Sequence, residues 1–511
     1  MATALAVAAT LVGGSLVVGI LPSRTKGPSG RVRVGPETPT TAMDLGSGPA
    51  NNSPVIQADP NQARFVAMAH RLDAPDFGCG LSLSGDGGRR WAPARPIAAL
   101  PPGAEKCYAP EVGFDGAGTL YYLFVGLAGA GNEPMGAFLT TSKDRGRSFA
   151  APHRVLGPLN FGVRMAIDAT MGQMGRLHLV WLHATSDPPL GGFGSPPNPI
   201  LAAHSDDGGR SFSEPVQVSD GGREKVTAPA LALGPGRAVH VGYYDLGDDA
   251  RDYHGLEGPV WEGRWALVVS SSFDGGGRFG PGVVAEEAVV PFERVMLVFT
   301  MAPPALVAED RRVCVGWADS RLGDADAWVR CSPDAGRTWN RPHRINDDAR
   351  ANTRAQYLPR LAMAANGRLD AIFLDRRGDA DNVRNDVFYT YSTNDGRSFA
   401  PNLKLTQEPS NSQVGPSYAN VSSRGLVEIG SRLGLMSTPS RVVAAWPDTR
   451  NSRPRTTAQD VFATVVELPE PSGATAGTRI LGGAMAGVGL AVMGWVVARR
   501  RRGPPPEASH P

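Results

Sequence analysis

The chain has 511 residues, a formal net charge of only +2 at pH 7, and 63 glycines and 44 prolines. The balanced charge argues against a nucleic-acid partner. The many glycines and prolines argue against a mainly helical protein and favour short strands joined by turns.

The chain begins with an apolar segment. Residues 2–21 are long enough for the apolar core of a signal peptide or for a membrane-spanning helix. Arg24 and Lys26 follow the run instead of preceding it, so both interpretations stay open. We assign residues 1–22 to this segment and residues 23–50, rich in Pro, Gly, Ser and Thr, to a linker with a short strand near residues 31–34.

An eight-residue pattern, Ser-x-Asp-x-Gly-x-x-aromatic, occurs six times at steps of 58 to 67 residues. The third position is held by Asp86, Asp144, Asp207, Asp274, Asp334 and Asn394. A short carboxylate or amide bonds the backbone that follows it, and glycine supplies the positive φ of a tight turn. Each copy therefore predicts a structural corner between two strands, and the fixed period predicts a repeat architecture.

The six copies resemble the Asp boxes of the sialidase-like, or BNR-repeat, β-propellers, over about residues 51–467. The resemblance implies one all-β propeller of four-stranded blades, with each box between the third and fourth strands of a blade. The sequence shows seven pairs of first and second strands, the last first strand near residues 416–420, but only six boxes. We expect seven blades, the last completed by the segment near residues 31–34; the six-bladed ring of true sialidases is the alternative.

After the repeats come a Pro/Gly/Ser linker (468–479), an apolar run (480–498) and a basic tail (499–511). Nineteen apolar residues followed by four arginines predict a single transmembrane helix with its basic end in the cytoplasm. The order resembles PEP-type C-terminal sorting signals. We expect a propeller outside the cell membrane, either anchored there by this helix or released to the cell surface or medium after processing.

The chain has four cysteines, Cys79, Cys107, Cys314 and Cys331. Cys79 and Cys107 flank one blade-to-blade connection, and Cys314 and Cys331 lie on consecutive strands. Two local disulfides are expected for an exported chain, and four buried thiols are the alternative.

Function is expected on the face opposite the boxes, where second strands end in a recurring Asp-x-Arg. The three copies are Asp319–Arg321, Asp375–Arg377 and Asp448–Arg450. These arginines match the carboxylate of a sialic or uronic acid, or else each pairs with the aspartate of its own blade. The loops between blades add Glu111, Arg164, Tyr357, Arg360 and Tyr418.

The resemblance to sialidases implies three arginines on the substrate carboxylate, an acid/base aspartate and a tyrosine activated by a glutamate. Arg321, Arg377 and Arg450 would fill the first role, with Arg164, Arg360 and Tyr357 as further binding residues. Catalytic candidates are Tyr418, Glu111, Asp319 and Asp375. The Phe-Arg-Ile-Pro strand of that family is absent, since the chain has Ser53-Pro-Val-Ile where its first blade begins.

We therefore expect a monomeric propeller that binds a glycan or another cell-surface partner without full sialidase catalysis. An active exo-α-sialidase-type hydrolase and a purely architectural envelope protein are the alternatives. No metal is expected as a cofactor, because no histidine pair has zinc spacing. Acidic groups that could bind Ca²⁺ or be solvated turns are Asp324 and Asp326, then Asp379, Asp381 and Asp386, and lastly Asp248, Asp249 and Asp252.

Overall fold

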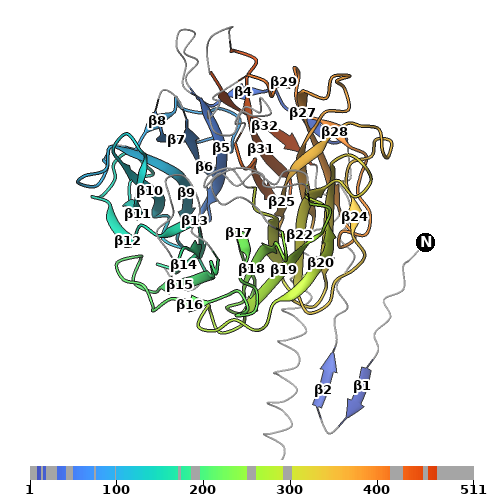
Figure 1. Cartoon of the computed structure of the whole chain (residues 1–511), viewed down its shortest axis with the longest axis horizontal. Coiled ribbons are helices and arrows are strands. Elements are labelled where there is room, and N and C mark those ends of the chain that lie inside the picture. Colours follow the sequence, from blue (N-terminus) through green and yellow to red (C-terminus); the bar gives the residue numbers. More distant parts are fainter. Residues whose placement is uncertain are drawn as a thin grey trace, which may run out of the picture.

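Seven β-sheets surround a central axis in the computed structural model of the chain (Figure 1). The structure describes residues 9–12, 15–18, 31–41, 50–73, 76–97, 99–170, 174–185, 196–249, 261–291, 302–414, 430–452 and 458–468. Every regular element in these ranges is a strand, and none of them contains a helix suited to crossing a bilayer. Strands β1 (Ala9–Val12) and β2 (Ser15–Val18) pair with each other. The expected transmembrane run at 480–498 lies outside the described residues.

Each blade is an antiparallel sheet, and in blades 1 to 6 its strands follow one another in the sequence. The first strands are β5 (Asn51–Asp59), β9 (Lys106–Phe114), β13 (Asn160–Asp168), β17 (Val226–Leu233), β21 (Ala305–Glu309), β25 (Gln356–Met363) and β30 (Gly434–Thr438). The second strands are β6 (Gln62–Leu72), β10 (Leu120–Ala128), β14 (Arg176–His183), β18 (Val239–Asp245), β22 (Arg312–Asp319), β26 (Leu369–Asp375) and β31 (Arg441–Asp448).

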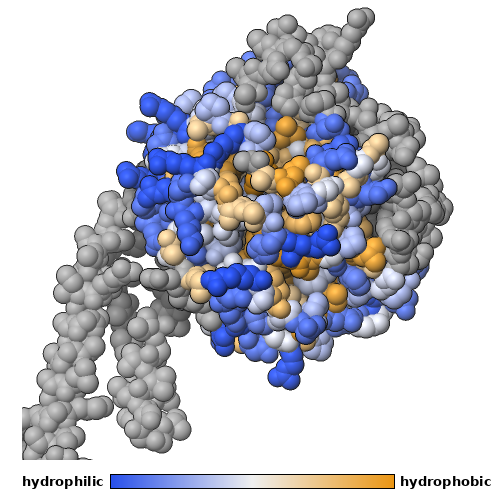
Figure 2. Space-filling view, turned by 90° about the vertical axis from the view of Figure 1, so that its left-hand side faces the viewer, coloured by the Kyte–Doolittle hydropathy of each residue, from blue (hydrophilic) through white to orange (hydrophobic). Residues whose placement is uncertain are grey.

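The third strands are β7 (Gly78–Ser84), β11 (Glu133–Ser142), β15 (Ile200–Ser205), β19 (Trp265–Ser272), β23 (Asp326–Ser332), β27 (Arg384–Ser392) and β32 (Asp460–Glu467). The fourth strands of blades 1 to 6 are β8 (Arg95–Pro96), β12 (His153–Leu156), β16 (Val216–Gln217), β20 (Val283–Val289), β24 (His343–Arg344) and β28 (Leu403–Lys404). In blade 6, β29 (Ser410–Asn411) also pairs with β27. The outer side that carries β8 and β12 is mostly hydrophilic, with smaller hydrophobic areas between (Figure 2).

The N-terminal segment closes the ring. Strands β3 (Arg33–Val34) and β4 (Thr38–Pro39) take the fourth place in blade 7 by pairing with β32. The expectation of seven blades, completed from the N-terminus, is therefore confirmed. The first strand of blade 7 is β30, however, whereas the sequence placed it near residues 416–420, which lie outside the described residues.

The hydrophobic core lies between neighbouring blades, so both faces of each sheet are buried. Second strands are accordingly apolar along most of their length, as expected for strands covered on both sides. Trp181, Trp317 and Trp446 stand near the ends of three second strands and are at most 1 % exposed. Burial of each large ring stabilises the packing of one blade against the next.

The six Asp boxes share one hydrogen-bond pattern. In the second box, Ser142 Oγ donates to Asp144 Oδ1 (2.8 Å), and the amides of Gly146 and Ser148 donate to Ser142 Oγ (2.7 Å) and Asp144 Oδ1 (2.9 Å). The amide oxygen of Asn394 takes the same place in the sixth box, accepting from Ser398 N at 3.0 Å. Because these bonds favour the carboxylate, the pKa of Asp144 lies well below its usual value.

The boxes lie on one face of the disc, which we call the box face. The turns between first and second strands share this face. In blades 1, 4 and 5 the amide at the fourth box position donates to the carbonyl of Arg64, Arg237 or Arg311, which lie in that turn or at the start of the second strand. Loops between blades, and between second and third strands, therefore lie on the opposite face.

The structure joins the cysteines in two disulfides. Cys79 of β7 is bonded to Cys107 of β9 and so links blades 1 and 2. Cys314 and Cys331 are bonded across strands β22 and β23 of blade 5.

Candidate functional site

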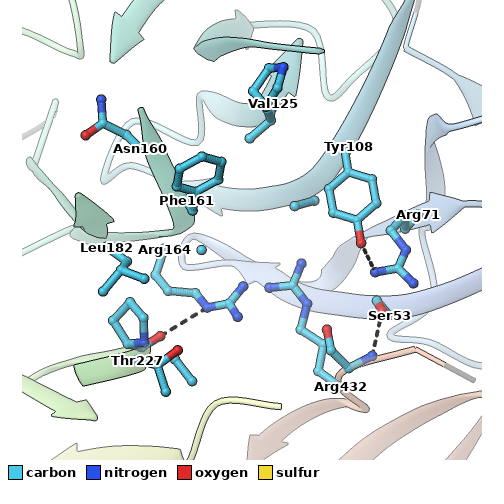
Figure 3. A pocket seen from close by; sticks show the side chains of 16 residues that line it. Ser53, Arg71, Tyr108, Val125, Asn160, Phe161, Arg164, Leu182, Thr227 and Arg432 are labelled. Carbon is cyan, nitrogen blue, oxygen red and sulfur yellow. Dashed lines mark hydrogen bonds between the residues drawn. The ribbon is translucent and has the colours of Figure 1, made fainter. Parts of the chain in front are cut away.

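A pocket opens on the face opposite the boxes, between the first strands of blades 1 to 4 and the segment that precedes β30 (Figure 3). Strands β5, β9, β13 and β17 begin at this face. Residues at the starts of these four strands, and at the ends of second strands β6, β10 and β14, line the pocket. Arg164 and Arg432 extend toward each other across it (Figure 3).

A bulge recurs near the start of five first strands. Its residue has a φ between 49° and 59° in every case, and is Ser53, Ala109, Gly162, Ala228 or Leu358. The register with the second strand shifts at each of these points. Four of the five are followed by proline, which is the proline of the expected first strands. Positive φ at residues other than glycine is uncommon, and bulges of this kind re-aim side chains.

The residue two places after the bulge is charged in three blades. It is Glu111 in blade 2, Arg164 in blade 3 and Arg360 in blade 6, whereas blades 1 and 4 have Val55 and Ala230 there. Because first strands surround the axis, the repeat brings these three charges together near the middle of the disc.

A fourth charge, Arg432, joins them from the segment before β30. Arg164 Nη1 lies 3.0 Å from Glu111 Oε1, and Arg432 Nη1 donates to the same oxygen. Arg432 also donates to the carbonyl of Pro110 at 3.0 Å, and Arg164 Nε to that of Pro229 at 3.3 Å. We call Glu111, Arg164, Arg360 and Arg432 the axial arginine cluster.

The cluster carries more positive than negative charge, since Arg164 and Arg432 are bonded to Glu111 and the guanidinium of Arg360 lies within electrostatic range of the same carboxylate. Burial lowers the pKa of Arg164 to about 10, and the nearby charge of Arg432 acts in the same direction. Burial and Arg432 also lower the pKa of Arg360. Nε of both Arg360 and Arg432 is buried without a hydrogen-bond partner. The cluster is therefore suited to an additional anion.

The pocket wall combines apolar and polar groups. Phe161, Val125 and Leu182 supply buried apolar surface. The hydroxyl of Tyr108 accepts a hydrogen bond from Arg71, which is only 1 % exposed and bonded to Asp73 at 2.6 Å.

Arg321, Arg377 and Arg450, the Asp-x-Arg arginines, are not among the residues that line this pocket. Each is bonded to the aspartate of its own blade, at 2.6, 2.8 and 2.6 Å respectively. Each also lies over an aromatic ring of the adjoining third strand, Trp328, Phe388 or Phe462. A repeated internal ion pair, not convergence, explains why this motif follows the period.

Asp319, Asp375 and Tyr357, which the sequence also suggested, are likewise not among the residues that line this pocket. Asp319 and Asp375 are fully buried beneath their arginines. Tyr357 donates to Asn385 Oδ1 at 2.8 Å and accepts from Arg376 at 2.9 Å, within blade 6. Tyr418 and Asp252 lie outside the described residues. Elsewhere in the described ranges, no three His, Cys, Asp or Glu side chains are grouped to hold a metal ion.

Sequence reasoning placed Glu111, Arg164 and Arg360 in loops between blades but missed Arg432. The reason is that the sequence placed the first strand of blade 7 near residues 416–420. This position put Arg432 inside the blade instead of at its start. An arginine two residues before Gly434 would otherwise have been recognised as a neighbour of the axis.

No protein-family model and no curated protein matches the chain. Solved structures do match it, over most of its length. A family PL25 ulvan lyase matches with 11 % identity and a TM-score of 0.47, covering 88 % of this chain and 97 % of its own. An α-L-arabinofuranosidase from Fusarium graminearum matches with 12 % identity and a TM-score of 0.42, covering 87 % and 99 %.

A sialidase described as Hadza microbial sialidase Hz136 matches with 16 % identity and a TM-score of 0.42, covering 72 % of this chain and 68 % of its own. These matched structures include enzymes that act on glycans. At such low similarity they do not define an activity for this chain. The chain is a seven-bladed β-propeller.

Proposed function

We propose that the protein is an exported, membrane-anchored β-propeller whose axial pocket binds the carboxylate of an acidic saccharide, such as a sialic or uronic acid, without hydrolysing it. The observation that carries the proposal is the axial arginine cluster, in which Arg164 and Arg432 line an open pocket and are bonded to Glu111, with Arg360 nearby. Anchoring is supported by the apolar run at 480–498 and the arginines at 499–502.

A carboxylate is the anion that suits the cluster. Guanidinium groups present planar pairs of N–H donors that match two carboxylate oxygens. A bound carboxylate would offset one of the two excess positive charges, and it would give acceptors to Arg432, which lines the pocket. Charge-assisted bonds of this kind contribute about 1.5–3 kcal/mol each.

A sugar suits the rest of the pocket. Phe161 and Tyr108 offer aromatic surface to the C–H faces of a pyranose, while Asn160, Ser53 and Thr227 offer hydrogen bonds to hydroxyl groups. Apolar walls with a few placed polar groups are typical of small-molecule sites.

The environment of Glu111 favours binding over hydrolysis. In a sialidase-type mechanism a glutamate must take a proton from the tyrosine nucleophile. Glu111 Oε1 instead accepts from Arg164 and Arg432, so that oxygen is already engaged by two donors. The hydroxyl of Tyr108 contacts the guanidinium of Arg71.

Calorimetric titration with N-acetylneuraminic acid and with glucuronic acid tests binding. We expect at least one of the two to bind, and Arg432→Ala to weaken binding by about 2–5 kcal/mol, the range for truncating one partner of a buried charge pair. Arg147→Ala is the matched control, because Arg147 is exposed on the box face. Equal loss in both variants, or no binding of either sugar, would contradict the proposal.

Turnover is measured with 4-methylumbelliferyl sialoside and glucuronide, for which we expect no release. Release that is lost in Arg432→Ala but kept in Arg147→Ala would show that the pocket hydrolyses glycosides instead of only binding them.

A further inference from the structure

We propose that the box face of the disc lies flat on the phospholipid surface of the anchoring membrane, so that the axial pocket opens away from it. This inference rests on the anchoring part of the proposed function. It also rests on where the chain leaves the disc, and on two exposed apolar side chains at the opposite edge.

The chain leaves blade 7 on the box face. After β32, the amide of Leu468 donates to the carbonyl of Ser440 in the turn between β30 and β31, at 2.8 Å. Glu467 is bonded at 2.5 Å to Arg89 of the first Asp box. Strand β3 starts at the same corner, since Arg33 is paired with Glu467. Both ends of the described propeller therefore reach the box face at blade 7.

The tether to the apolar run is short. Residues 469–479 separate the propeller from the run that begins at Ile480. A fully extended chain spans at most about 3.3–3.6 Å per residue, which gives these residues a reach of roughly 40 Å. An eight-residue strand such as β31 already spans about 26 Å from face to face. Turning the pocket toward the bilayer would consume most of that reach, whereas the box face needs none of it.

A second contact region lies at blades 3 and 4, on the other side of the ring from blade 7 (Figure 1). Met174 and Phe273 are 46 % and 50 % exposed there. Within the described ranges, the one other exposed large hydrophobic side chain is that of Val284, at 38 %, on the outer strand β20. Met174 precedes β14 in a box-face turn, and Phe273 is the second residue of the fourth Asp box.

Arginines lie in the boxes and turns next to these two apolar side chains. The guanidinium of Arg337 lies 5.2 Å from the centre of the Phe273 ring, and Arg210 and Arg237 are exposed in the adjoining box and turn. The neighbouring carboxylate of Asp206 is bonded to Arg176 at 2.6 Å, and that of Asp274 accepts from Ser272 within its box. Apolar side chains flanked by arginines suit the headgroup region, where long cations reach lipid phosphates.

Two contacts at opposite edges hold a disc parallel to the surface that it touches. The tether acts at blade 7, and Met174 and Phe273 act at blades 3 and 4. The axial pocket, on the far face, then points into the surrounding medium, where a glycan can reach it.

The orientation is measured on the full chain in liposomes of phosphatidylcholine and phosphatidylglycerol that carry a headgroup-attached quencher. Gly85→Cys labels the box face and Gly221→Cys the opposite face. Both glycines are exposed with open space around an added Cβ. All four native cysteines are in disulfides, so each new thiol is the only free one. We expect a fluorophore at residue 85 to be quenched several-fold more than one at residue 221.

Equal quenching at the two positions, stronger quenching at residue 221, or failure of the chain to float with the liposomes would overturn the proposal. The double variant Met174→Ser/Phe273→Ser should reduce quenching at residue 85, and Val284→Ser is the matched control. Unchanged quenching in the double variant would refute the contact at blades 3 and 4. Raising the salt to 1 M, where the screening length is about 3 Å, should weaken the arginine part of that contact.

The readout is independent of sugar binding. Titration of the same liposomes with N-acetylneuraminic acid and glucuronic acid reports on the pocket alone, so failure of the orientation and failure of the proposed function are distinguishable.

Discussion

Glu111, Arg164 and Arg360 occupy one repeat position in three blades, two residues after a left-handed bulge. In two other blades the same position holds Val55 or Ala230. The repeat thus provides a ring of equivalent places around the axis, and the choice of side chain at each place sets the chemistry of the pocket. Arg432, which enters from outside this pattern, completes the excess of positive charge.

Removing the single negative charge of the cluster tests its electrostatics. Glu111→Gln leaves three guanidinium groups facing one another, and we expect a loss of about 3–5 kcal/mol in unfolding free energy, the range for breaking a buried ion pair. Added glucuronate or sulfate should restore part of that stability, and more than it raises that of the wild type. Thermal denaturation with and without the anion measures both effects. A stability equal to that of the wild type would show that the arginines need no counter-charge.

The Asp-x-Arg residues show which side-chain contacts can be predicted from the sequence and which cannot. A motif that recurs with the period serves the repeat, which is what Arg321, Arg377 and Arg450 do inside their blades. The charges at the axis, by contrast, occupy a repeat position whose residue type changes from blade to blade. The contact between Arg432 and Glu111 joins residues 321 positions apart, so it depends on the three-dimensional closure of the ring and has no local signal.

The Asp box, by contrast, was predictable because its hydrogen bonds lie within eight residues. Its glycine has two requirements, a positive φ and space. Gly209 has a φ of 83°, and an added Cβ would lie 2.3 Å from Leu139 Cδ2 of the preceding blade. Gly247 has a φ of 58° with nothing near an added Cβ.

We therefore expect Gly247→Ala to cost about 1 kcal/mol in unfolding free energy, from backbone conformation alone. Gly209→Ala should cost about 1–3 kcal/mol more, because the methyl group overpacks the contact between blades. Urea denaturation of the two variants separates these effects. Equal losses would show that the box glycine serves the turn only.

The N-terminal segment closes the ring by pairing with the last strand of blade 7. Its Glu37 side chain is 4 % exposed and is bonded to Arg450 of blade 7 at 2.5 Å, while it accepts from the amide of Gln407 after blade 6. The sequence predicted the strand near residues 31–34, because the last blade lacked a fourth strand. It did not predict the ion pair, since nothing local links residue 37 to residue 450.

Glu37→Ala should lower the unfolding free energy by about 3 kcal/mol, because Arg450 loses a buried partner. Arg33→Ala, which alters an exposed residue of the same segment, should change it by less than about 0.5 kcal/mol. Proteolysis should likewise release residues before blade 1 faster in the first variant. Equal stability of the two would contradict the fastening role of Glu37.

Acid sensitivity is a property of the whole disc, because histidines are packed between its blades. Burial lowers the pKa of His70, His178 and His240 to about 4, below the ordinary value of 6.5. In the unfolded chain these groups take up protons as the pH falls below about 6.5, whereas in the folded chain they do so only near pH 4. The contribution of each neutral histidine to the unfolding free energy is therefore fully present above pH 6.5, and it is lost progressively as the pH falls to 4.

The slope is about 1.4 kcal/mol per pH unit for each such histidine. Urea denaturation between pH 7 and pH 5 should show this loss, and His240→Gln should make the dependence shallower. His183→Gln, a half-buried residue of β14, is the control. A dependence unchanged in His240→Gln would contradict the assignment.

The proposed function of the whole molecule depends on recognition of a carboxylate by the axial arginine cluster. Calorimetry of the full chain with the methyl glycoside of whichever sugar acid binds, and with the carboxyl methyl ester of that glycoside, tests it, because the two sugars differ only in the carboxylate charge and its ester group. The account predicts binding of the acid and little or none of the ester. Equal affinity for the two, or binding of the acid that persists when Arg164 and Arg432 are both changed to alanine, would contradict it.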